Sequence, residues 1–408
     1  MQLIRKWNSI SLILRILVGI VIGVILGLVV PSQTWIGILG ELFVGALKAI
    51  APILVFVLVA SSLANAKGGH AKKFRTVIFL YLFSTLVAAV ATVIANFISP
   101  VTVPLTGIDE VEGFTAPQGM AEVMGNMLKN IVANPIDAMI NANYLGILFW
   151  AVILGIALKR ASDSTKTFMN DLSDAASVAV RVVISCAPFG IMGLVFTAVS
   201  ESGLAIFKTY GHLVALLVIT MLIVAFVLNP IIVGVTLRHN PYPLIFKCIR
   251  TSGVTAFFTR SSAANIPVNM ELCDELGLDE EMYSVSIPLG ATINMNGAAV
   301  TITTFALTAA FTTGVPVTIP LAILLSIVAT LSACGASGVA GGSLLLVPLG
   351  CSLFGISADI GMLMVGIGFI VSVIQDSMET ALNSSGDAIF TATAEFREWK
   401  KEGRPLPL

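Results

Sequence analysis

Apolar stretches recur from one end of this sequence to the other, and most are long enough to cross a lipid bilayer. A spanning helix needs about 20 mainly apolar residues. Here 57% of the residues are hydrophobic and only 11% are charged, whereas soluble proteins carry roughly 25% charged residues. Because lipid offers no partner to a free backbone group, spanning segments of this length must be helices. The sequence therefore predicts an all-α polytopic protein embedded in the lipid bilayer.

The basic residues orient these stretches, because Lys and Arg concentrate in cytoplasmic loops. The densest basic cluster runs from Lys67 to Arg75, and Lys159-Arg160 form another. We expect both clusters, and both chain termini, on the cytoplasmic side. The spans expected in this first part are about residues 11–30, 38–65, 77–98, 143–158, 168–199 and 210–237.

Two later apolar stretches have centres unsuited to a continuous helix in lipid. Residues 243–272 are interrupted by TRSSAANIP (Thr259 to Pro267), and residues 319–357 by the glycine-rich SACGASGVAGG. For the flanking spans to keep their orientation, each of these stretches must enter and leave the membrane on the same side. This predicts two re-entrant hairpins beside eight transmembrane helices. Each hairpin precedes a polar-interrupted helix, so the two units form inverted repeats, as in many secondary transporters. The last two spans are expected at 282–311 and 359–392.

The last span carries one polar face. At 100° per residue its polar side chains fall within about 100° of arc, on a single stripe. Carboxylates that faced the acyl chains would be costly, so the stripe should face protein, water, ions or a ligand. The stripe consists of Asp376, Glu379, Thr380, Asn383 and Asp387.

The span at 282–311 is interrupted by Asn294-Met295-Asn296-Gly297. Asn and Gly favour an unwound backbone, which is tolerated at membrane depth only where it lines a cavity or binds something. Free carbonyl oxygens there would suit a small hard cation such as sodium. From the residues alone, other readings stay open: a plain kink here, a cytoplasmic loop at TRSSAANIP, close helix packing at the glycine-rich centre, and a ligand-free hydrogen-bond network along the stripe.

With these four motifs in this order, the chain resembles the dicarboxylate/amino acid:cation symporter family, which has the glutamate-transporter fold, and particularly its bacterial serine/threonine:sodium symporters. The resemblance implies sodium-coupled uptake of a small neutral amino acid, L-serine or L-threonine, by a homotrimer in the bacterial inner membrane. It implies that residues 1–240 are mostly scaffold, with the third span joining the transport part. Residues 241–395 would form a transport core that moves like an elevator, and 396–408 a cytoplasmic tail. Nucleic acid is not an expected partner.

The resemblance also implies roles for individual residues. Ser261 and Ser262 would bind the substrate carboxylate, and Asp376 the substrate ammonium. The second hairpin, including Gly338, would gate the pocket. Other residues of the substrate pocket would be Glu379, Thr380 and Asn383. Sodium would be bound by Asn294, Asn383, Asp387, Asn296, Tyr81, Ser84 and Thr85.

The chain departs from the family pattern at two positions. Asn296 replaces the usual aspartate of NMDG, so fewer sodium ions are expected per substrate than in the glutamate carriers of this family. Glu379 stands where carriers of acidic substrates place an arginine, and its carboxylate would repel glutamate or aspartate. Arg260 is expected to neutralise Glu379 or Asp376 as a buried partner.

Two other classes of function share some of these sequence features. A channel is the closer rival, because re-entrant loops and polar stripes also build selectivity filters. An intramembrane protease is not expected: the G-x-S-G match at Gly335 to Gly338 has no base within reach, since no histidine lies in the middle of a span. A carrier for another amino acid or a dicarboxylate also remains open.

Overall fold

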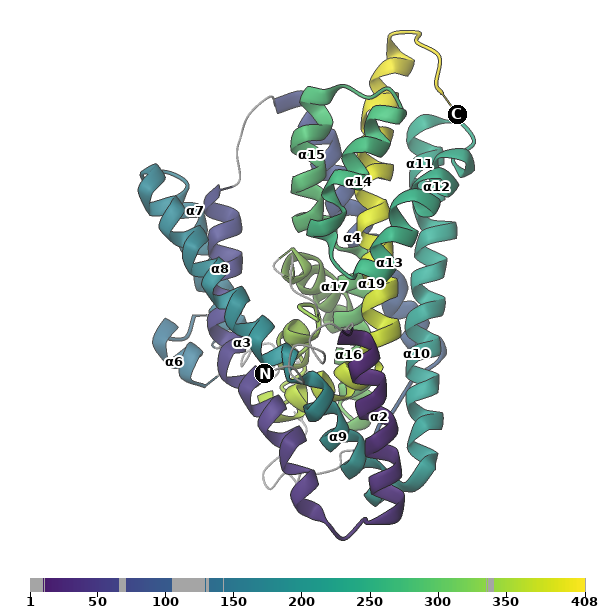
Figure 1. Cartoon of the computed structure of the whole chain (residues 1–408). Helices are drawn as coiled ribbons and strands as arrows, with labels where there is room; N and C mark the ends of the chain where they lie inside the picture. Colours follow the sequence, from purple (N-terminus) through teal and green to yellow (C-terminus); the bar gives the residue numbers. More distant parts are fainter. Residues whose placement is uncertain are drawn as a thin grey trace.

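The computed structural model describes residues 10, 12–65, 71–104, 129, 132–141, 143–334, 336 and 341–407. Every regular element in these residues is a helix (Figure 1), which confirms the all-α prediction. Five helices of the described part are long and apolar enough to cross a membrane, or six if one bent pair is a single span. The protein is therefore a multi-pass membrane protein.

The first part of the chain forms a set of mostly apolar helices. These helices are α2 (Leu12–Val29), α3 (Ile38–Asn65), α4 (Ala71–Ile98), α6 (Pro135–Ile140), α7 (Tyr144–Leu158), α8 (Asp163–Ser185), α9 (Ala187–Ser202), α10 (Ile206–Ile223) and α11 (Asn229–Leu237), with one π-helical turn at Val224–Leu228 between α10 and α11.

Helices α2 and α9 pack closely and run in the same direction. A Cβ at Gly19 would lie 2.2 Å from the carbonyl oxygen of Pro188, and one at Gly27 would lie 3.0 Å from that of Phe196. The close contact therefore requires glycine at these positions. Because the residue numbers of the contacts increase together in α2 and α9, the two helices are parallel. The first turn of α2 therefore lies at the same end of the pair as the beginning of α9.

The apolar stretch expected at 168–199 is not one straight helix. It divides into α8 and α9, which meet at an angle of 53°. Pro188 lies in the first turn of α9, where its missing N–H costs no helical hydrogen bond but prevents α8 from continuing through it. Polar and charged residues from Asp163 onward also make α8 amphipathic.

The second part of the chain contains the interrupted helices. They are α12 (Tyr242–Cys248), a π-helical turn (Ile249–Gly253), α13 (Val254–Thr259), α14 (Ser262–Glu275), α15 (Glu280–Ile293), α16 (Asn296–Thr312), α17 (Ile319–Ala333), a 3₁₀ turn (Leu344–Leu346), α18 (Val347–Ser352) and α19 (Ala358–Lys401).

A sharp turn joins α13 to α14. Arg260 ends α13 in the left-handed region, with φ 52° and ψ 34°, a conformation that is uncommon for a residue other than glycine. Ser261 is the N-cap of α14, and its Oγ accepts a hydrogen bond of 3.2 Å from the backbone N–H of Ala264. The predicted interruption at TRSSAANIP is therefore a helix–turn–helix.

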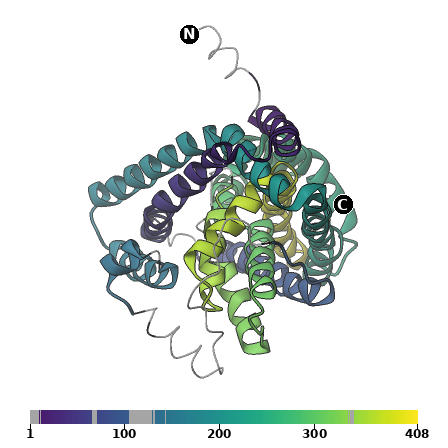
Figure 2. The same cartoon turned by 90° about the horizontal axis from the view of Figure 1, so that it is seen from below.

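The break predicted at Asn294 is present, because α15 ends at Ile293 and α16 begins at Asn296. Helix α16 is buried along most of its length and packs on α4, α17, α18 and α19. Seen from below, most helices of the first part, coloured purple to teal, lie around the green and yellow helices of the second part, which reach the edge of the molecule on the remaining side (Figure 2). Helix α19 has 44 residues and continues past the end expected at 392, to Lys401.

Gly297 lets α16 approach α19 at the level of the polar stripe. A Cβ there would lie 2.8 Å from both the Cα and the carbonyl oxygen of Glu379. We expect Gly297→Ala to cost about 1–3 kcal/mol, because the two backbones must move apart. Thermal unfolding in detergent measures this. Gly211→Ala in α10 is the matched control, since nothing lies within 4 Å of that position. Equal melting temperatures for the two variants would contradict the expectation.

Candidate functional site

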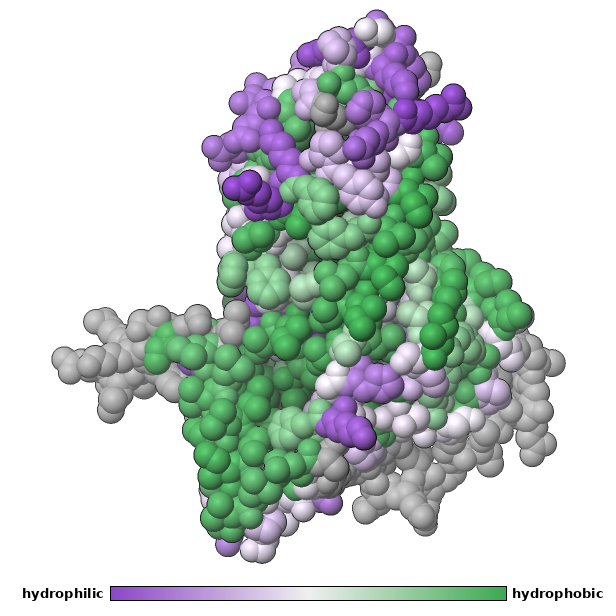
Figure 3. All heavy atoms as spheres, turned by 90° about the vertical axis from the view of Figure 1, so that its right-hand side faces the viewer, coloured by the Kyte–Doolittle hydropathy of each residue, from purple (hydrophilic) through white to green (hydrophobic). Residues whose placement is uncertain are grey.

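The polar stripe of α19 faces the interior of the protein. Its five side chains belong to residues that are at most 6% exposed, whereas hydrophobic residues cover much of the face shown in Figure 3. This confirms that the stripe avoids lipid. Its contacts divide into groups around Asp376, Glu379 and Asp387.

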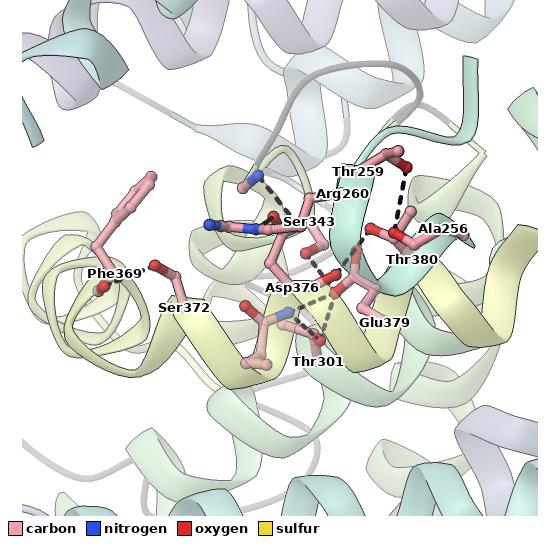
Figure 4. Close-up of polar contacts among 12 residues, drawn as sticks. Ala256, Thr259, Arg260, Thr301, Ser343, Phe369, Ser372, Asp376, Glu379 and Thr380 are labelled. Atoms are coloured by element: carbon pink, nitrogen blue, oxygen red, sulfur yellow. Dashed lines mark hydrogen bonds and ion pairs between the residues drawn. The ribbon is translucent and has the colours of Figure 1, made fainter. Parts of the chain in front are cut away.

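Asp376 connects α19 to two other segments (Figure 4). Its Oδ2 accepts a hydrogen bond of 2.7 Å from Arg260 Nε in the turn between α13 and α14, and both side chains are less than 10% exposed. Its Oδ1 lies 3.4 Å from the backbone nitrogen of Gly341, just before α18. Of the two partners expected for Arg260, the structure thus selects Asp376.

Glu379 is held by a cage of three donors. Its Oε2 accepts from Thr301 Oγ1 at 2.6 Å, from Ser343 Oγ at 2.8 Å and from Gln375 Nε2 at 2.6 Å. Thr301 comes from α16 and Ser343 from just before the 3₁₀ turn that precedes α18, as Figure 4 shows. Gln375 lies one turn earlier in α19. Charge-assisted hydrogen bonds of this kind are short and strong. They fix the Glu379 carboxylate next to Asp376.

The third group surrounds Asp387 and the break between α15 and α16. Asn294 Nδ2 donates to Asp387 Oδ1 at 2.9 Å and to the carbonyl oxygen of Asn383 at 3.0 Å. The Asn383 side chain accepts from the backbone N–H of Gly297 at 2.7 Å. Among the described residues, Asp387 Oδ2 and Asn294 Oδ1 are buried without a hydrogen-bond partner. Buried oxygens of this kind suit a bound cation.

Tyr81 in α4 reaches the same region. Its hydroxyl lies 3.1 Å from the carbonyl oxygen of Asp387, 3.1 Å from that of Ser286 and 2.8 Å from Thr391 Oγ1. It thus links α4 to α15 and α19 beside the break. The structure does bring this residue of the third span to Asp387.

Asn296 forms a neighbouring polar group with α4. Its Oδ1 accepts from Ser84 Oγ at 3.1 Å and from Thr85 Oγ1 at 2.9 Å. Its Nδ2 lies 3.4 Å from Asn229 Oδ1. Both amides and both hydroxyls are at most 1% exposed. The group is therefore a buried network without a formal charge.

The remaining predicted residues lie beside these groups. Ser262, 8% exposed, begins α14 next to the Arg260 turn. Thr380 Oγ1 donates to the backbone carbonyl of Asp376 at 2.7 Å. Gly338 lies outside the described residues.

Sequence reasoning missed four residues of these groups. Gln375 precedes Glu379 by four positions, so helical spacing could have identified it. The Asn229-Pro230 pair inside an apolar span was a signal that could have identified Asn229. Thr301 and Ser343 carried no such signal, because only the folded chain brings them to Glu379.

The three groups could together bind an organic zwitterion and a small cation. The described residues contain no group of three or more His, Cys, Asp or Glu side chains placed to hold a metal. A cation at Asp387 would therefore rely on amide and carbonyl oxygens as well as one carboxylate, a set that suits sodium.

Comparison with known proteins identifies the family of this chain. The model of the sodium:dicarboxylate symporter family matches residues 12–395. The serine/threonine transporter SstT of Bifidobacterium adolescentis is 58% identical over 98% of this chain and 93% of its own length. The proteins of the same name from Streptococcus thermophilus and Streptococcus agalactiae are 54% and 55% identical, over 98% and 96% of this chain and 99% and 97% of their own lengths. The family consists of transporters, in agreement with the expectation that the protein is not an enzyme; this chain belongs to the sodium:dicarboxylate symporter family.

Proposed function

We propose that this protein carries L-serine and L-threonine into the cell together with sodium. Relatives that match nearly the whole chain are named serine/threonine transporters. The observation that carries the proposal is the pair of buried carboxylates, Asp376 and Glu379, one helical turn apart on α19.

Asp376 and the start of α14 would bind the amino-acid backbone of the substrate. The substrate ammonium would replace the Arg260 guanidinium on Asp376, because both are cations that donate hydrogen bonds to a carboxylate. The substrate carboxylate would lie near Ser261 and Ser262, where the free N–H groups of α14 and its dipole favour a negative charge. Thr380 and Asn383 would line the pocket, and the segment that includes Gly338 would close it.

Glu379 would select the side chain of the substrate. Its carboxylate stays in place through Thr301, Ser343 and Gln375. A second carboxylate on the substrate would be repelled there, whereas the hydroxyl of serine or threonine could donate to it. Acidic amino acids and dicarboxylates are therefore the disfavoured substrates.

Sodium would bind near the break in the α15–α16 pair. Asp387, Asn294 and the Asn383 carbonyl would supply oxygen ligands, and the two partnerless oxygens support this placement. Tyr81, Ser84, Thr85 and Asn296 would form a weaker, uncharged cation site.

The proposed mechanism is elevator-type alternating access in a homotrimer of the bacterial inner membrane, with cytoplasmic termini. Its architecture would be eight transmembrane helices and two re-entrant hairpins, α12–α14 and α17–α18, in inverted repeats. Residues 1–240 would be mostly scaffold, with α4 in the transport part. Residues 241–395 would form the moving core, and 396–408 the cytoplasmic tail.

Uptake by the purified protein in liposomes tests the proposal. We expect labelled serine and threonine to accumulate under an inward sodium gradient, with saturation, and to stop accumulating when the gradient is collapsed. Labelled aspartate should not accumulate. Uptake of aspartate but not serine would identify a carrier for acidic substrates instead, and flux that neither saturates nor needs sodium would identify a channel.

Asn296→Asp should increase the apparent affinity for sodium during serine uptake. The substitution adds a negative charge to a buried group of oxygens, so the sodium concentration for half-maximal serine uptake should fall by on the order of tenfold. Serine uptake measured against sodium concentration checks this. In the double variant with Ser84→Ala, the gain should shrink because one oxygen ligand is lost. An unchanged sodium curve in Asn296→Asp would show that no cation binds there.

A further inference from the structure

A basic pocket lies where the turn between α13 and α14 meets α2 and α8. It has a volume of about 320 Å³, and its lining includes Arg15 from α2, Arg181 from α8 and Arg260 from the turn. Arg260 and Ser261, which also lines the pocket, belong to the candidate substrate site, whereas Arg15 and Arg181 have no role in that site. Arg15 is half-buried and Arg181 exposed. Converging arginines form a site for an anion such as a phosphate group.

The pocket lies near the first turns of α2, at one end of a helix that is just long enough to span a bilayer. Helix α2 has 18 residues, or about 27 Å at 1.5 Å per residue, which only just crosses a hydrocarbon core of about 30 Å. Arg15 is in its first turns, and Arg181 and Ser185 are in the last turns of α8, which leads into α9. Because α2 and α9 run in parallel from this end, the arginines lie near one end of the helix pair, where a lipid headgroup would be within their reach.

An apolar groove begins on the other side of the same turn. It has a volume of about 260 Å³ and is lined by α10 and the π-helical turn after it, by the α12–α13 segment and by α19. Its lining residues include Leu222, Ala225, Phe257, Phe258 and Met378. Phe258 lines this groove and the next residue, Thr259, lines the basic pocket. The Phe258 side chain is 72% exposed. An anionic pocket ligand with an apolar tail could therefore occupy both.

We propose that the basic pocket and the apolar groove together bind one anionic phospholipid, with its phosphate on Arg15 and Arg181 and an acyl chain in the groove. Basic pockets between transmembrane helices are recognised sites for anionic headgroups. The lipid would contact α2 and α8 on one side and the α13–α14 turn on the other. If the lipid binds this arrangement of the two sides more tightly than any other arrangement, its binding increases the population of this arrangement.

Native mass spectrometry of the delipidated full-length protein tests the proposal, with phosphatidylglycerol and phosphatidylcholine as probes. We expect the wild type to retain phosphatidylglycerol in preference to phosphatidylcholine. Arg15→Gln/Arg181→Gln should lower phosphatidylglycerol retention at least fivefold. The matched control is Arg75→Gln/Lys208→Gln, which removes the same charge from two exposed positions outside both cavities and should bind like the wild type. Equal retention in the two double variants, whether high or low, overturns the site.

Two further measurements keep the test decisive. Ala225→Phe fills the apolar groove and leaves both arginines in place, so it should also lower phosphatidylglycerol retention; unchanged retention overturns the acyl-chain part. This variant also serves if the arginine variant does not fold. Excess inorganic phosphate should not displace the lipid, because phosphate lacks the chain. Complete displacement by phosphate would identify a free-anion site and overturn the lipid assignment.

Discussion

Asp387→Asn is expected to remove the sodium dependence of substrate binding. The Asp387 side chain is 1% exposed, one of its oxygens has no hydrogen-bond partner among the described residues, and the other accepts from Asn294. Replacing the carboxylate with an amide removes the only formal charge from this set of oxygens. Since affinity for a hard cation depends on the charge of its ligands, we expect sodium affinity to fall by at least about tenfold.

Sodium-induced thermal stabilisation of the purified protein measures this loss without requiring transport, because a ligand that binds only the folded state raises its stability. Asp359→Asn is the matched control: Asp359 is an exposed aspartate in the first turn of the same helix. It should keep the wild-type sodium response. If Asp387→Asn were stabilised by sodium at wild-type concentrations, Asp387 would not be a ligand.

The sequence predicted much of the site because helical geometry and the cost of polar groups in lipid act locally. The stripe from Asp376 to Asp387 must lie on one face of any helix, and lipid cannot be the environment of that face. The break at Asn294 and the turn at Arg260 followed from residues that weaken a helix in a membrane. These features need no knowledge of the rest of the fold.

Contacts between distant segments could not be predicted in this way. Thr301 and Ser343 approach Glu379 from positions 78 and 36 residues away in the chain. Whether Arg260 would pair with Asp376 or Glu379 depended on the path of the α13–α14 turn, which apolar periodicity does not fix. The bend between α8 and α9 was missed because the hydropathy of the sequence does not change around Pro188, where the helix breaks.

Asp376→Asn is expected to abolish serine binding, since it removes the charge that would hold the substrate ammonium. The same change leaves the Arg260 guanidinium buried without its carboxylate partner. Losing one member of a buried ion pair destabilises a protein by about 3–5 kcal/mol. Loss of serine binding in this variant alone could therefore reflect a less stable protein as well as a lost contact.

Arg260→Gln separates these two effects. It keeps Asp376 and removes the cation that would compete with the substrate ammonium, so serine affinity should be retained or increased. The double variant Arg260→Gln/Asp376→Asn removes both charges of this pair, so it should recover stability but still fail to bind serine. Isothermal titration with serine at saturating sodium, beside thermal unfolding of each variant, measures both quantities. If the double variant bound serine with wild-type affinity, the ammonium role of Asp376 would be wrong, and the pair would serve only to join the α13–α14 turn to α19.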